Sequence, residues 1–385
     1  MEKKELRKIT QEELDMILKN HKLWLDTHGA EGEQACLSYM DLTGVNLENA
    51  YLHRANLIGT NLQGANLENK DLRAVDFTWA DLSNDNMSGA NLSYAIMDGA
   101  DLSGLNLVNA NLCGANMDSV DLVFASLANA DMGNAYLSGA RLKGANLTNA
   151  NLREANLEWS YLEGANLLDA NLLGAKLTGA DLIGANLEHA NLRSAKLVCA
   201  RLKGANLTNA NLREANLDDI NLEGANLMVA NLEGANLERA NLGHADLTFA
   251  DLKDANLKLA DLTGVNLTNI KNLPDISMVC PETGLIICWK KALGDFIIKL
   301  EIPEDAKRSS AIGSRKCRCN KAKVLSIEYL DGTPAEVTSV HSKHYPDFIY
   351  KVGETVEVPD FDENRFRECS TGIHFFMTRG EAFAY

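Results

Sequence analysis

The residues best suited to chemistry lie in the last third of this 385-residue chain. They are five cysteines and three histidines, namely Cys280, Cys288, Cys317, Cys319, Cys369, His341, His344 and His374. Four of them would be enough for a zinc site, but Cys317-x-Cys319 is not the usual knuckle spacing and the Cys369–His374 pair is a weak signal. Nothing marks an activated thiol for a Cys/His nucleophile either. We therefore expect reduced structural thiols, with no metal, no cofactor and no catalytic residue.

A basic run in the same region is the second candidate. No acid interrupts the segment from Ala306 to Ile327, which contains Lys307, Arg308, Arg315, Lys316, Arg318, Lys321 and Lys323. Such a run is typical of a solvated face. The alternatives are a site for an anion or nucleic acid, or a surface that docks on acidic parts of this chain or of a second copy. The sequence has no phosphate loop, dinucleotide fingerprint or nucleophile elbow, so an enzyme in this region remains only an alternative.

Composition limits the partners and the compartment. The formal net charge is −16, so free DNA or an anionic membrane is a poor match for the chain as a whole. No run approaches 18 apolar residues, and the charged N-terminus lacks a signal-peptide pattern. We expect a cytoplasmic protein without a membrane span, whose cysteines stay reduced.

The dominant feature of the sequence is a five-residue repeat. From Leu37 to Leu267 an apolar residue stands at every fifth position, giving 47 centres, of which 42 are Leu. A small residue stands two positions before most centres, Ala in 36 cases, and Asn or Asp usually lies between them. In an extended segment, residues two apart point the same way, so each Ala and Leu face inward together. A period of five excludes a helix and indicates a β-solenoid.

These repeats resemble the pentapeptide-repeat family. Runs such as Ala205-Asn206-Leu207 and Ala225-Asn226-Leu227 follow its A(D/N)LXX pattern, and the similarity covers residues 35–269. The resemblance implies an all-β solenoid, a right-handed quadrilateral β-helix with 20 residues per coil and about 12 coils. The five-residue period alone does not separate four sides from three.

With four sides assumed, charge is unevenly distributed around the rod. The side centred on Leu47 and Leu67 has six acids and no Lys or Arg, and we call it the base-free side. The adjoining side, centred on Leu42 and Leu62, has eight acids and four bases. A solvated rod kept soluble by charge explains this pattern, and an anionic edge offered to a basic groove is the functional alternative. The residues proposed for such an edge are Glu48, Glu68, Asp169, Glu188 and Asp246 on the base-free side, with Glu163 and Glu223 on the adjoining side.

Two further sets of residues depart from a plain solvated rod. Four aromatic residues fall on the side centred on Leu37, namely Tyr39, Trp79, Tyr136 and Trp159, and we expect Trp79 and Trp159 to be partner-binding candidates. Lys70 and Asp85 place charge at inward positions, where an unpaired charge is costly. We expect them to form an ion pair, or both to lean outward at a distorted corner.

The two ends of the array differ from its middle. Residues 1–34 are expected to cap the rod with an amphipathic helix over 10–28, because Thr10 and Glu13 form a capping-box pattern; a helix that binds another protein is the alternative. Residues 35–270 form the repeat domain. Residues 271–385 are expected to be a compact, mostly β domain, with strands at Asp295–Pro303, Lys321–Leu330, Phe348–Pro359 and Gly372–Met377 and a helix or tail at Arg379–Tyr385.

The C-terminal region resembles an uncharacterised domain that follows other pentapeptide arrays, through SRKCR around Cys317 and the stretch Cys369–Phe376. That resemblance implies no activity. We therefore expect a non-enzymatic protein-binding or scaffold protein that acts through the rod surface. The main alternative comes from the family resemblance: some pentapeptide-repeat proteins imitate DNA and occupy type II topoisomerases such as gyrase. Direct DNA binding by the acidic rod is not expected, and self-association is a further alternative.

Overall fold

The computed structural model describes residues 6–274, 280–281, 283–310, 315–343, 345, 347–363 and 371–385. The chain divides into two compact units. The first is Met1–Asn256 with Gly264–Leu273, and the second is Leu257–Thr263 with Pro274–Tyr385. The first contains the repeats and the second contains a β-sheet domain.

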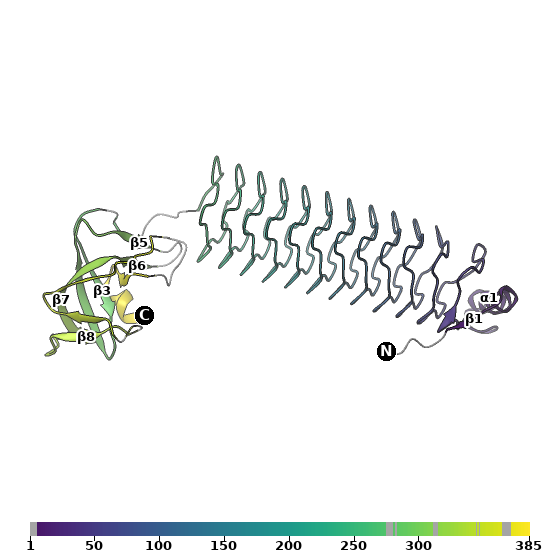
Figure 1. Cartoon of the computed structure of the whole chain (residues 1–385), viewed down its shortest axis with the longest axis horizontal. Helices are drawn as coiled ribbons and strands as arrows, with labels where there is room; N and C mark the ends of the chain where they lie inside the picture. Colours follow the sequence, from purple (N-terminus) through teal and green to yellow (C-terminus); the bar gives the residue numbers. More distant parts are fainter. Residues whose placement is uncertain are drawn as a thin grey trace. The chain divides into compact units, whose positions relative to one another are not determined.

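The repeats form a β-helix rod whose coils stack side by side (Figure 1). Parallel bridges join residues 20 apart along most of the array, for example Asn186 to Asn206 and Asn206 to Asn226. The backbone of each coil bonds to the next coil, with Leu187 N–H donating to Asn206 O (2.7 Å) and Asn206 N–H to Ala185 O (2.9 Å). One coil therefore contains four five-residue repeats.

Each repeat turns the chain with the same backbone geometry. The Ala190 N–H donates to Leu187 O at 3.0 Å, which closes a turn over the two residues between them. The second of these residues has a positive φ, 59° at His189 and 64° at Gly184. Gly, Asn and Asp tolerate this conformation best, which explains why they are common at that position.

The Asn between Ala and Leu is a structural residue. Asn186 Oδ1 accepts from the Glu188 N–H (3.3 Å) and from Asn206 Nδ2 (3.0 Å), while Asn186 Nδ2 donates to Asn166 Oδ1 (3.0 Å). The side chain thus closes its own turn and links three coils. Since Ala and Leu are buried and Asn is engaged in this ladder, the two turn residues of each repeat are the main positions available to a partner, together with the larger side chains that replace Asn, such as Tyr136 and Tyr161.

Helix α1 (Gln11–Asp26) covers the N-terminal end of the rod, preceded by strand β1 (Arg7–Lys8), which pairs with β2 (Met40–Asp41). The expected capping box is confirmed, because Thr10 Oγ1 accepts from the Glu13 N–H and the Glu13 side chain accepts from the Thr10 N–H. His21 is fully buried and joins the helix to the first coil. Its Nδ1 accepts from the Ala35 N–H (3.1 Å), and its Nε2 lies 3.0 Å from His53 O.

The second unit is built on a seven-stranded antiparallel sheet in the order β10-β7-β4-β3-β11-β6-β5. Its elements are β3 (Ile286–Lys291), β4 (Phe296–Ile302), β5 (Arg308–Ser310), β6 (Lys316–Cys319), β7 (Lys321–Tyr329), β10 (Thr355–Glu357), β11 (Ile373–Phe376) and helix α2 (Arg379–Ala384). Strands β8 (Ser339–His341) and β9 (Ile349–Lys351) pair separately.

The expected strand Phe348–Pro359 is two strands in the structure. Residue Val352 follows β9 and Gly353, with φ 86°, lets the chain turn before β10. The two halves then pair with different partners, β9 with β8 and β10 with β7. Neither helix in the described part of the chain is long and apolar enough to cross a membrane.

Candidate functional site

The base-free side presents part of its acidic charge to solvent. Glu48, Glu68 and Asp169 are exposed on turn positions. Glu188 and Asp246 are half-buried and engaged locally: Glu188 accepts from Asn206 Nδ2 (3.3 Å) and Asp246 from the Thr248 N–H (2.9 Å). The structure therefore leaves the first three as the stronger candidates for contact with a partner.

The adjoining side neutralises most of its bases between coils. Arg141 pairs with Asp121 (2.5 Å), Arg201 with Asp181 (2.5 Å) and Lys203 with Glu223 (3.1 Å), each pair 20 residues apart. Glu223 therefore already forms an ion pair with a lysine of the same rod.

Glu163, the other candidate on this side, is half-buried. Its Oε2 has no hydrogen-bond partner within the residues that the structure describes.

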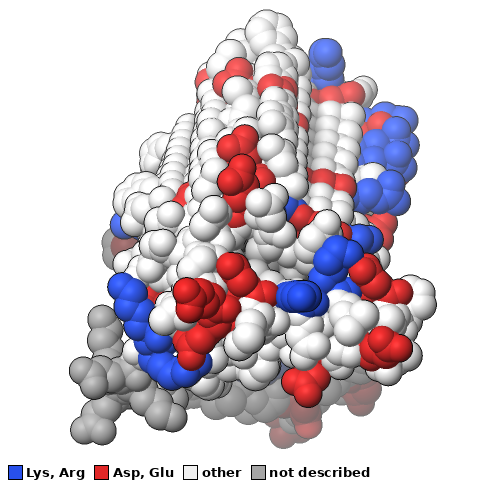
Figure 2. Space-filling view, turned by 90° about the vertical axis from the view of Figure 1, so that its right-hand side faces the viewer, with Lys and Arg blue, Asp and Glu red and all other residues white. Residues whose placement is uncertain are grey.

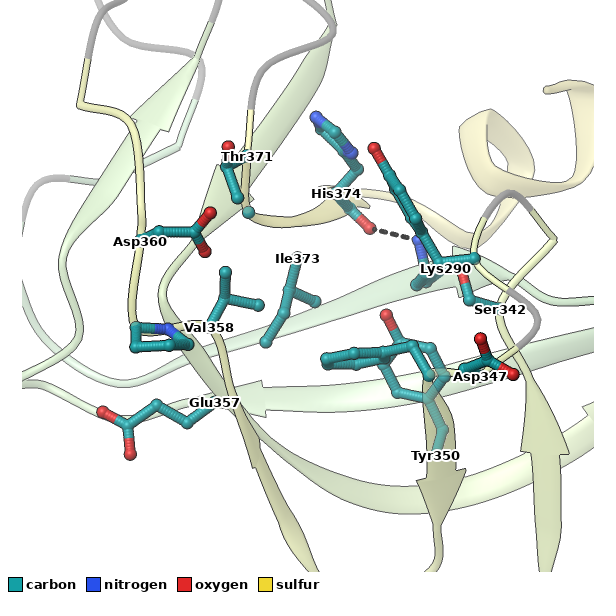
Figure 3. Close-up of a pocket in the computed structure, with 14 residues that line it drawn as sticks. Lys290, Ser342, Asp347, Tyr350, Glu357, Val358, Asp360, Thr371, Ile373 and His374 are labelled. Atoms are coloured by element: carbon teal, nitrogen blue, oxygen red, sulfur yellow. Dashed lines mark hydrogen bonds between the residues drawn. The ribbon is translucent and has the colours of Figure 1, made fainter.

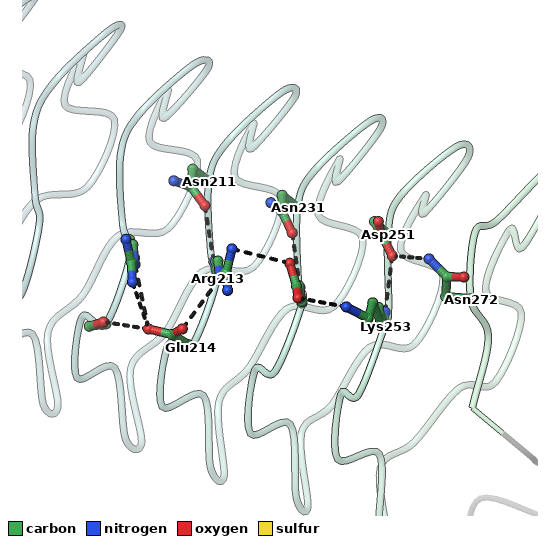
Figure 4. A network of polar contacts seen from close by, with 10 residues as sticks. Asn211, Arg213, Glu214, Asn231, Asp251, Lys253 and Asn272 are labelled. Atoms are coloured by element: carbon green, nitrogen blue, oxygen red, sulfur yellow. Dashed lines mark hydrogen bonds and ion pairs between the residues drawn. The ribbon is translucent and has the colours of Figure 1, made fainter.

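The side centred on Leu52 and Leu72 carries a continuous network of charges (Figure 4). Glu214 contacts Arg193 at 3.3 Å and Arg213 at 3.3 Å, and Glu233 links Arg213 (3.4 Å) to Lys253 (3.1 Å). The guanidinium of Arg193 keeps the pKa of Glu214 below its ordinary value. In Figure 2, Lys and Arg gather beside acids along one edge, and other acids stand apart from them in the same view.

The surface aromatic residues lie over glycines of the next coil. A Cβ added to Gly59, Gly99 or Gly179 would fall 2.6, 2.6 and 2.3 Å from the ring of the aromatic residue 20 positions earlier, which is Tyr39, Trp79 or Trp159. Trp79 and Trp159 nevertheless keep 58% and 61% of their surface exposed. One face of each ring is therefore packed on the rod and the other is open to solvent. This geometry is compatible with a role in stacking the coils and with contact to a partner.

Lys70 and Asp85 do not form the expected ion pair, because each charge has a different partner, and the alternative that both lean outward is wrong for Asp85, which is buried. Lys70 Nζ donates to the backbone oxygen of Glu48, and Asp85 accepts from the Gly64 N–H at 2.5 Å. Asp85 is 4% exposed, and burial raises its pKa to about 7 despite that hydrogen bond. Lys70 brings a positive charge close to Glu48, which weakens the negative field at that end of the base-free side.

The cysteines of the second unit form part of its core. Cys280, Cys288, Cys317 and Cys319 are all free thiols and fully buried. Burial raises the pKa of Cys288 and of Cys319, which opposes formation of the thiolate that a nucleophile or a metal ligand requires.

The described residues contain no group of three or more His, Cys, Asp and Glu side chains placed to hold a metal ion. His341 is exposed on β8 and His374 is half-buried on β11. Cys369 and His344 lie outside the described residues.

The basic run is not a continuous solvated face. Lys316 and Arg318 lie on β6 and are only 6% and 1% exposed. Lys316 Nζ donates to the Tyr385 hydroxyl (2.7 Å) and Arg318 Nε to Asp362 O (2.9 Å). Three other bases form ion pairs inside the unit: Lys307 with Glu363, Arg315 with Glu381 and Lys321 with Asp305.

A buried lysine, Lys290 on β3, was missed in the sequence. It borders a cavity of about 590 Å³ in the second unit, together with Tyr350 and Ile373 (Figure 3). The sequence signal was the alternation that puts Ile286, Cys288 and Lys290 on one face of a strand. All three side chains are buried in the structure.

Comparison with known proteins places both parts of the chain. The family described as pentapeptide repeats (8 copies) matches eight stretches of the chain, residues 34–69, 71–104, 95–134, 130–169, 170–209, 193–228, 205–242 and 230–269. A family of unknown function (DUF5758) matches residues 276–382. Both resemblances noted in the sequence are thereby confirmed. No match was found among the curated proteins.

Solved structures of other repeat proteins are similar to parts of this chain. HetL, involved in heterocyst differentiation regulation in the cyanobacterium Nostoc sp. strain PCC 7120, is 34% identical over 63% of this chain and 95% of its own, with a TM-score of 0.29. Rfr23 from the cyanobacterium Cyanothece 51142 is 45% identical over 24% of this chain and 58% of its own (TM-score 0.22). Full-length QnrB1, a plasmid-mediated fluoroquinolone resistance protein, is 21% identical over 45% of this chain and 89% of its own (TM-score 0.33).

All three TM-scores are below 0.5, so the assignment depends on the repeats themselves. The matched stretches extend over most of residues 34–269, which is more than half of the chain. The chain is therefore a member of the pentapeptide repeat family, with a C-terminal domain that matches a family of unknown function.

Proposed function

We propose that this chain is a non-enzymatic protein-binding or scaffold protein that acts through the surface of its rod. The observation that carries the proposal is the base-free side, where Glu48, Glu68 and Asp169 are exposed and no Lys or Arg belongs to the same side. On the neighbouring sides, by contrast, acids are paired with bases one coil away. A partner with a basic groove would find negative charge on the base-free side that no base of the same side offsets, weakened only at its N-terminal end, where Lys70 contacts the backbone of Glu48.

The test is a pull-down from host extract with the full chain and with a chain that lacks residues 271–385. A triple variant, Glu48→Gln, Glu68→Gln and Asp169→Asn, should lose the captured protein. A matched variant that neutralises Glu154, Glu214 and Glu233 changes the net charge equally but on the ion-paired side. If the two variants capture the partner equally well, the base-free side is not the binding surface.

A type II topoisomerase such as gyrase is the specific partner we would test first, because the family resemblance includes proteins that imitate DNA. Association driven by the base-free side should be tight at low salt and weak at high salt, since exposed charges are screened within about 10 Å at 0.1 M salt. Supercoiling by gyrase at low salt should then be inhibited by an excess of the chain. Unchanged supercoiling would exclude the DNA-mimic hypothesis for gyrase and leave the general scaffold role as the proposal.

The aromatic residues provide the competing binding mode. Trp79 and Trp159 each expose more than half of their surface, 58% and 61%. If they anchor the partner, replacing both with Ala should accelerate dissociation with little dependence on salt. Neutralising the acids should instead slow association, so the two modes separate in a kinetic binding experiment.

We further propose a right-handed, four-sided rod of about 12 coils, capped by residues 1–34, with repeats over 35–270 and a separate domain over 271–385. The 20-residue spacing of the bridges supports four repeats per coil. A crystal structure would test handedness and coil number, and limited proteolysis would test the two boundaries.

A further inference from the structure

Lys290 is a buried ammonium group without a carboxylate partner. It is 8% exposed, its Nζ donates to His374 O at 3.2 Å, and Nζ lies 5.7 Å from the centre of the Tyr350 ring. In the described part of the chain no carboxylate lies within 4.0 Å of Nζ, the limit for an ion pair. Burial, with a smaller contribution from the charge of Lys316, lowers the pKa of Lys290 to about 8. A buried cation of this kind costs stability unless an anion accompanies it.

The cavity beside Lys290 is polarised from floor to rim. Its floor is buried and contains Lys290, Ser342, Tyr350 and Ile373. Its rim is exposed and contains two acids, Asp360, whose carboxylate turns toward the cavity in Figure 3, and Asp347, which lies beside Ser342 and Tyr350. Glu357 also borders the cavity, but its carboxylate points away from the other labelled residues. The volume of about 590 Å³ is in the ordinary range for small-molecule sites.

We propose that this cavity binds a small molecule of the amino-acid class, with its carboxylate at Lys290 Nζ and a cationic group at Asp360. A carboxylate at the floor would supply the missing counter-charge, and Ser342 and Tyr350 border the same floor with hydroxyl groups that can donate hydrogen bonds. The acidic rim disfavours a phosphate or a dicarboxylate, because the second negative charge would face Asp360. The apolar side chains of Ile373 and Val358 border the space that the middle of the ligand would occupy.

The experiment is calorimetric titration of the full chain with three matched probes. L-Arginine has a carboxylate and a guanidinium at its two ends, agmatine lacks only the carboxylate, and L-norvaline lacks the guanidinium. We expect L-arginine to bind, and both other probes to bind at least about tenfold more weakly, the effect of losing one charge-assisted hydrogen bond. Equal binding of L-arginine and agmatine would overturn the role of Lys290, and no saturable binding of L-arginine would overturn the proposal.

Variants test the two ends separately. Lys290→Met should abolish the preference for L-arginine over agmatine, while Lys323→Met, an exposed lysine on β7, should leave binding unchanged. Asp360→Asn should weaken the binding of L-arginine and leave the binding of L-norvaline unchanged. Because Asp360 is exposed, this variant is expected to fold even if Lys290→Met does not. An Asp360→Asn protein that binds L-arginine normally would contradict the assignment of the rim.

Discussion

Several large turn residues of this rod pack against the equivalent turn of the next coil, 20 positions later. Tyr39, Trp79 and Trp159 each cover a glycine 20 positions later, and the same relation joins Phe124 to Gly144. At these turns the ring occupies the space that a side chain of the next coil would need, so glycine fits there; Phe249, which is followed by Asn269, shows that the pairing is frequent but not general. The relation becomes visible only when the coil length is known.

The first prediction concerns this pairing. Gly99→Ala should destabilise the rod more than Gly184→Ala. Both glycines have positive φ, 63° and 64°, so both variants incur the cost of Ala in that region, about 1–2 kcal/mol. Only Gly99 also meets a ring, that of Trp79 at 2.6 Å, which should add about 1–3 kcal/mol of overpacking. Urea denaturation of the two variants measures the difference.

The control for that prediction is the double variant Trp79→Ala with Gly99→Ala. Without the ring, the added methyl has nothing to displace, so the excess cost over Gly184→Ala should vanish. If the double variant keeps the full excess, the ring of Trp79 is not its cause.

Asp85 gives a prediction about pH. Its pKa is raised to about 7 in the folded chain because it is buried, against about 3.9 when unfolded. The folded state therefore holds a proton that the unfolded state releases, so stability is highest below pH 4 for this group and falls as the pH rises to about 7. Asp85→Asn should remove this loss and stabilise the chain at pH 8 by up to a few kcal/mol.

The measurement is the free energy of unfolding of both proteins at pH 5 and pH 8. Asp169→Asn, at an exposed position of the same side, is the matched control and should change neither value appreciably. A wild-type and an Asp85→Asn protein with the same pH profile would show that Asp85 keeps its ordinary pKa.

At the scale of elements, the N-terminal helix is held by a residue whose charge can change. His21 accepts a hydrogen bond from the Ala35 N–H through Nδ1, so its ring must be neutral or rearrange. Burial keeps the pKa of His21 below its ordinary value of 6.5. Unfolded chain therefore binds more protons than folded chain just below pH 6.5, and stability is lost as the pH falls through this range.

We expect the hydrogen-exchange protection of the Ala35 amide to fall between pH 7.5 and pH 5, while that of Ala190 in the middle of the rod does not. His21→Gln keeps an acceptor and a donor without a titratable ring, so this variant should flatten the pH dependence. An Ala35 protection factor that stays constant in the wild type would contradict the account of His21.

The sequence predicted elements well where they repeat and poorly where they do not. The buried Ala and Leu, the capping box at Thr10 and the solenoid all followed from local pattern. Strand β6 did not, because its sequence, Lys316–Cys319, alternates basic residues with Cys and resembles a solvated run, yet both of its faces are buried. The split of Phe348–Pro359 and the partner of Lys70 depend on contacts between distant residues, which no local pattern contains.

The candidate site divides in the same way. The uneven charge of the rod follows from counting along the sequence, but which acids are exposed does not. Glu188 and Glu223 are engaged by Asn206 and Lys203, residues 18 and 20 positions away. Such contacts follow from the coil length together with side-chain geometry, so the sequence identified the side but not the residues that remain accessible.

For the whole molecule, stability and surface pattern depend on different features of the repeat. Stacking buries the inward pair of nearly every repeat, whichever side it occupies, whereas ladders and ion pairs need residues 20 apart. Deleting residues 130–149 removes one full coil. The residue that then stands 20 positions after Phe124 is again a glycine, Gly164. Deleting residues 130–134 removes one repeat and should also keep the inward register, with a modest loss from mismatched contacts. Deleting residues 131–133 breaks the period of five and should prevent cooperative folding, as circular dichroism melting would report.

The last prediction compares partner binding by the two deletions that keep the inward register, and it rests on the proposed rod surface. After removal of residues 130–134, every later repeat shifts by one side, so Glu48 and Glu68 no longer share a side with Asp169. After removal of residues 130–149 the base-free side is shorter but continuous. A partner that reads one continuous acidic side should therefore bind the 20-residue deletion nearly as well as the wild type and the five-residue deletion much more weakly. The comparison is made by surface plasmon resonance with the captured partner at low salt, after melting curves show both deletions folded. Equal binding by both would mean that the partner contacts only one end of the rod, and reversed binding would exclude the base-free side as the contact.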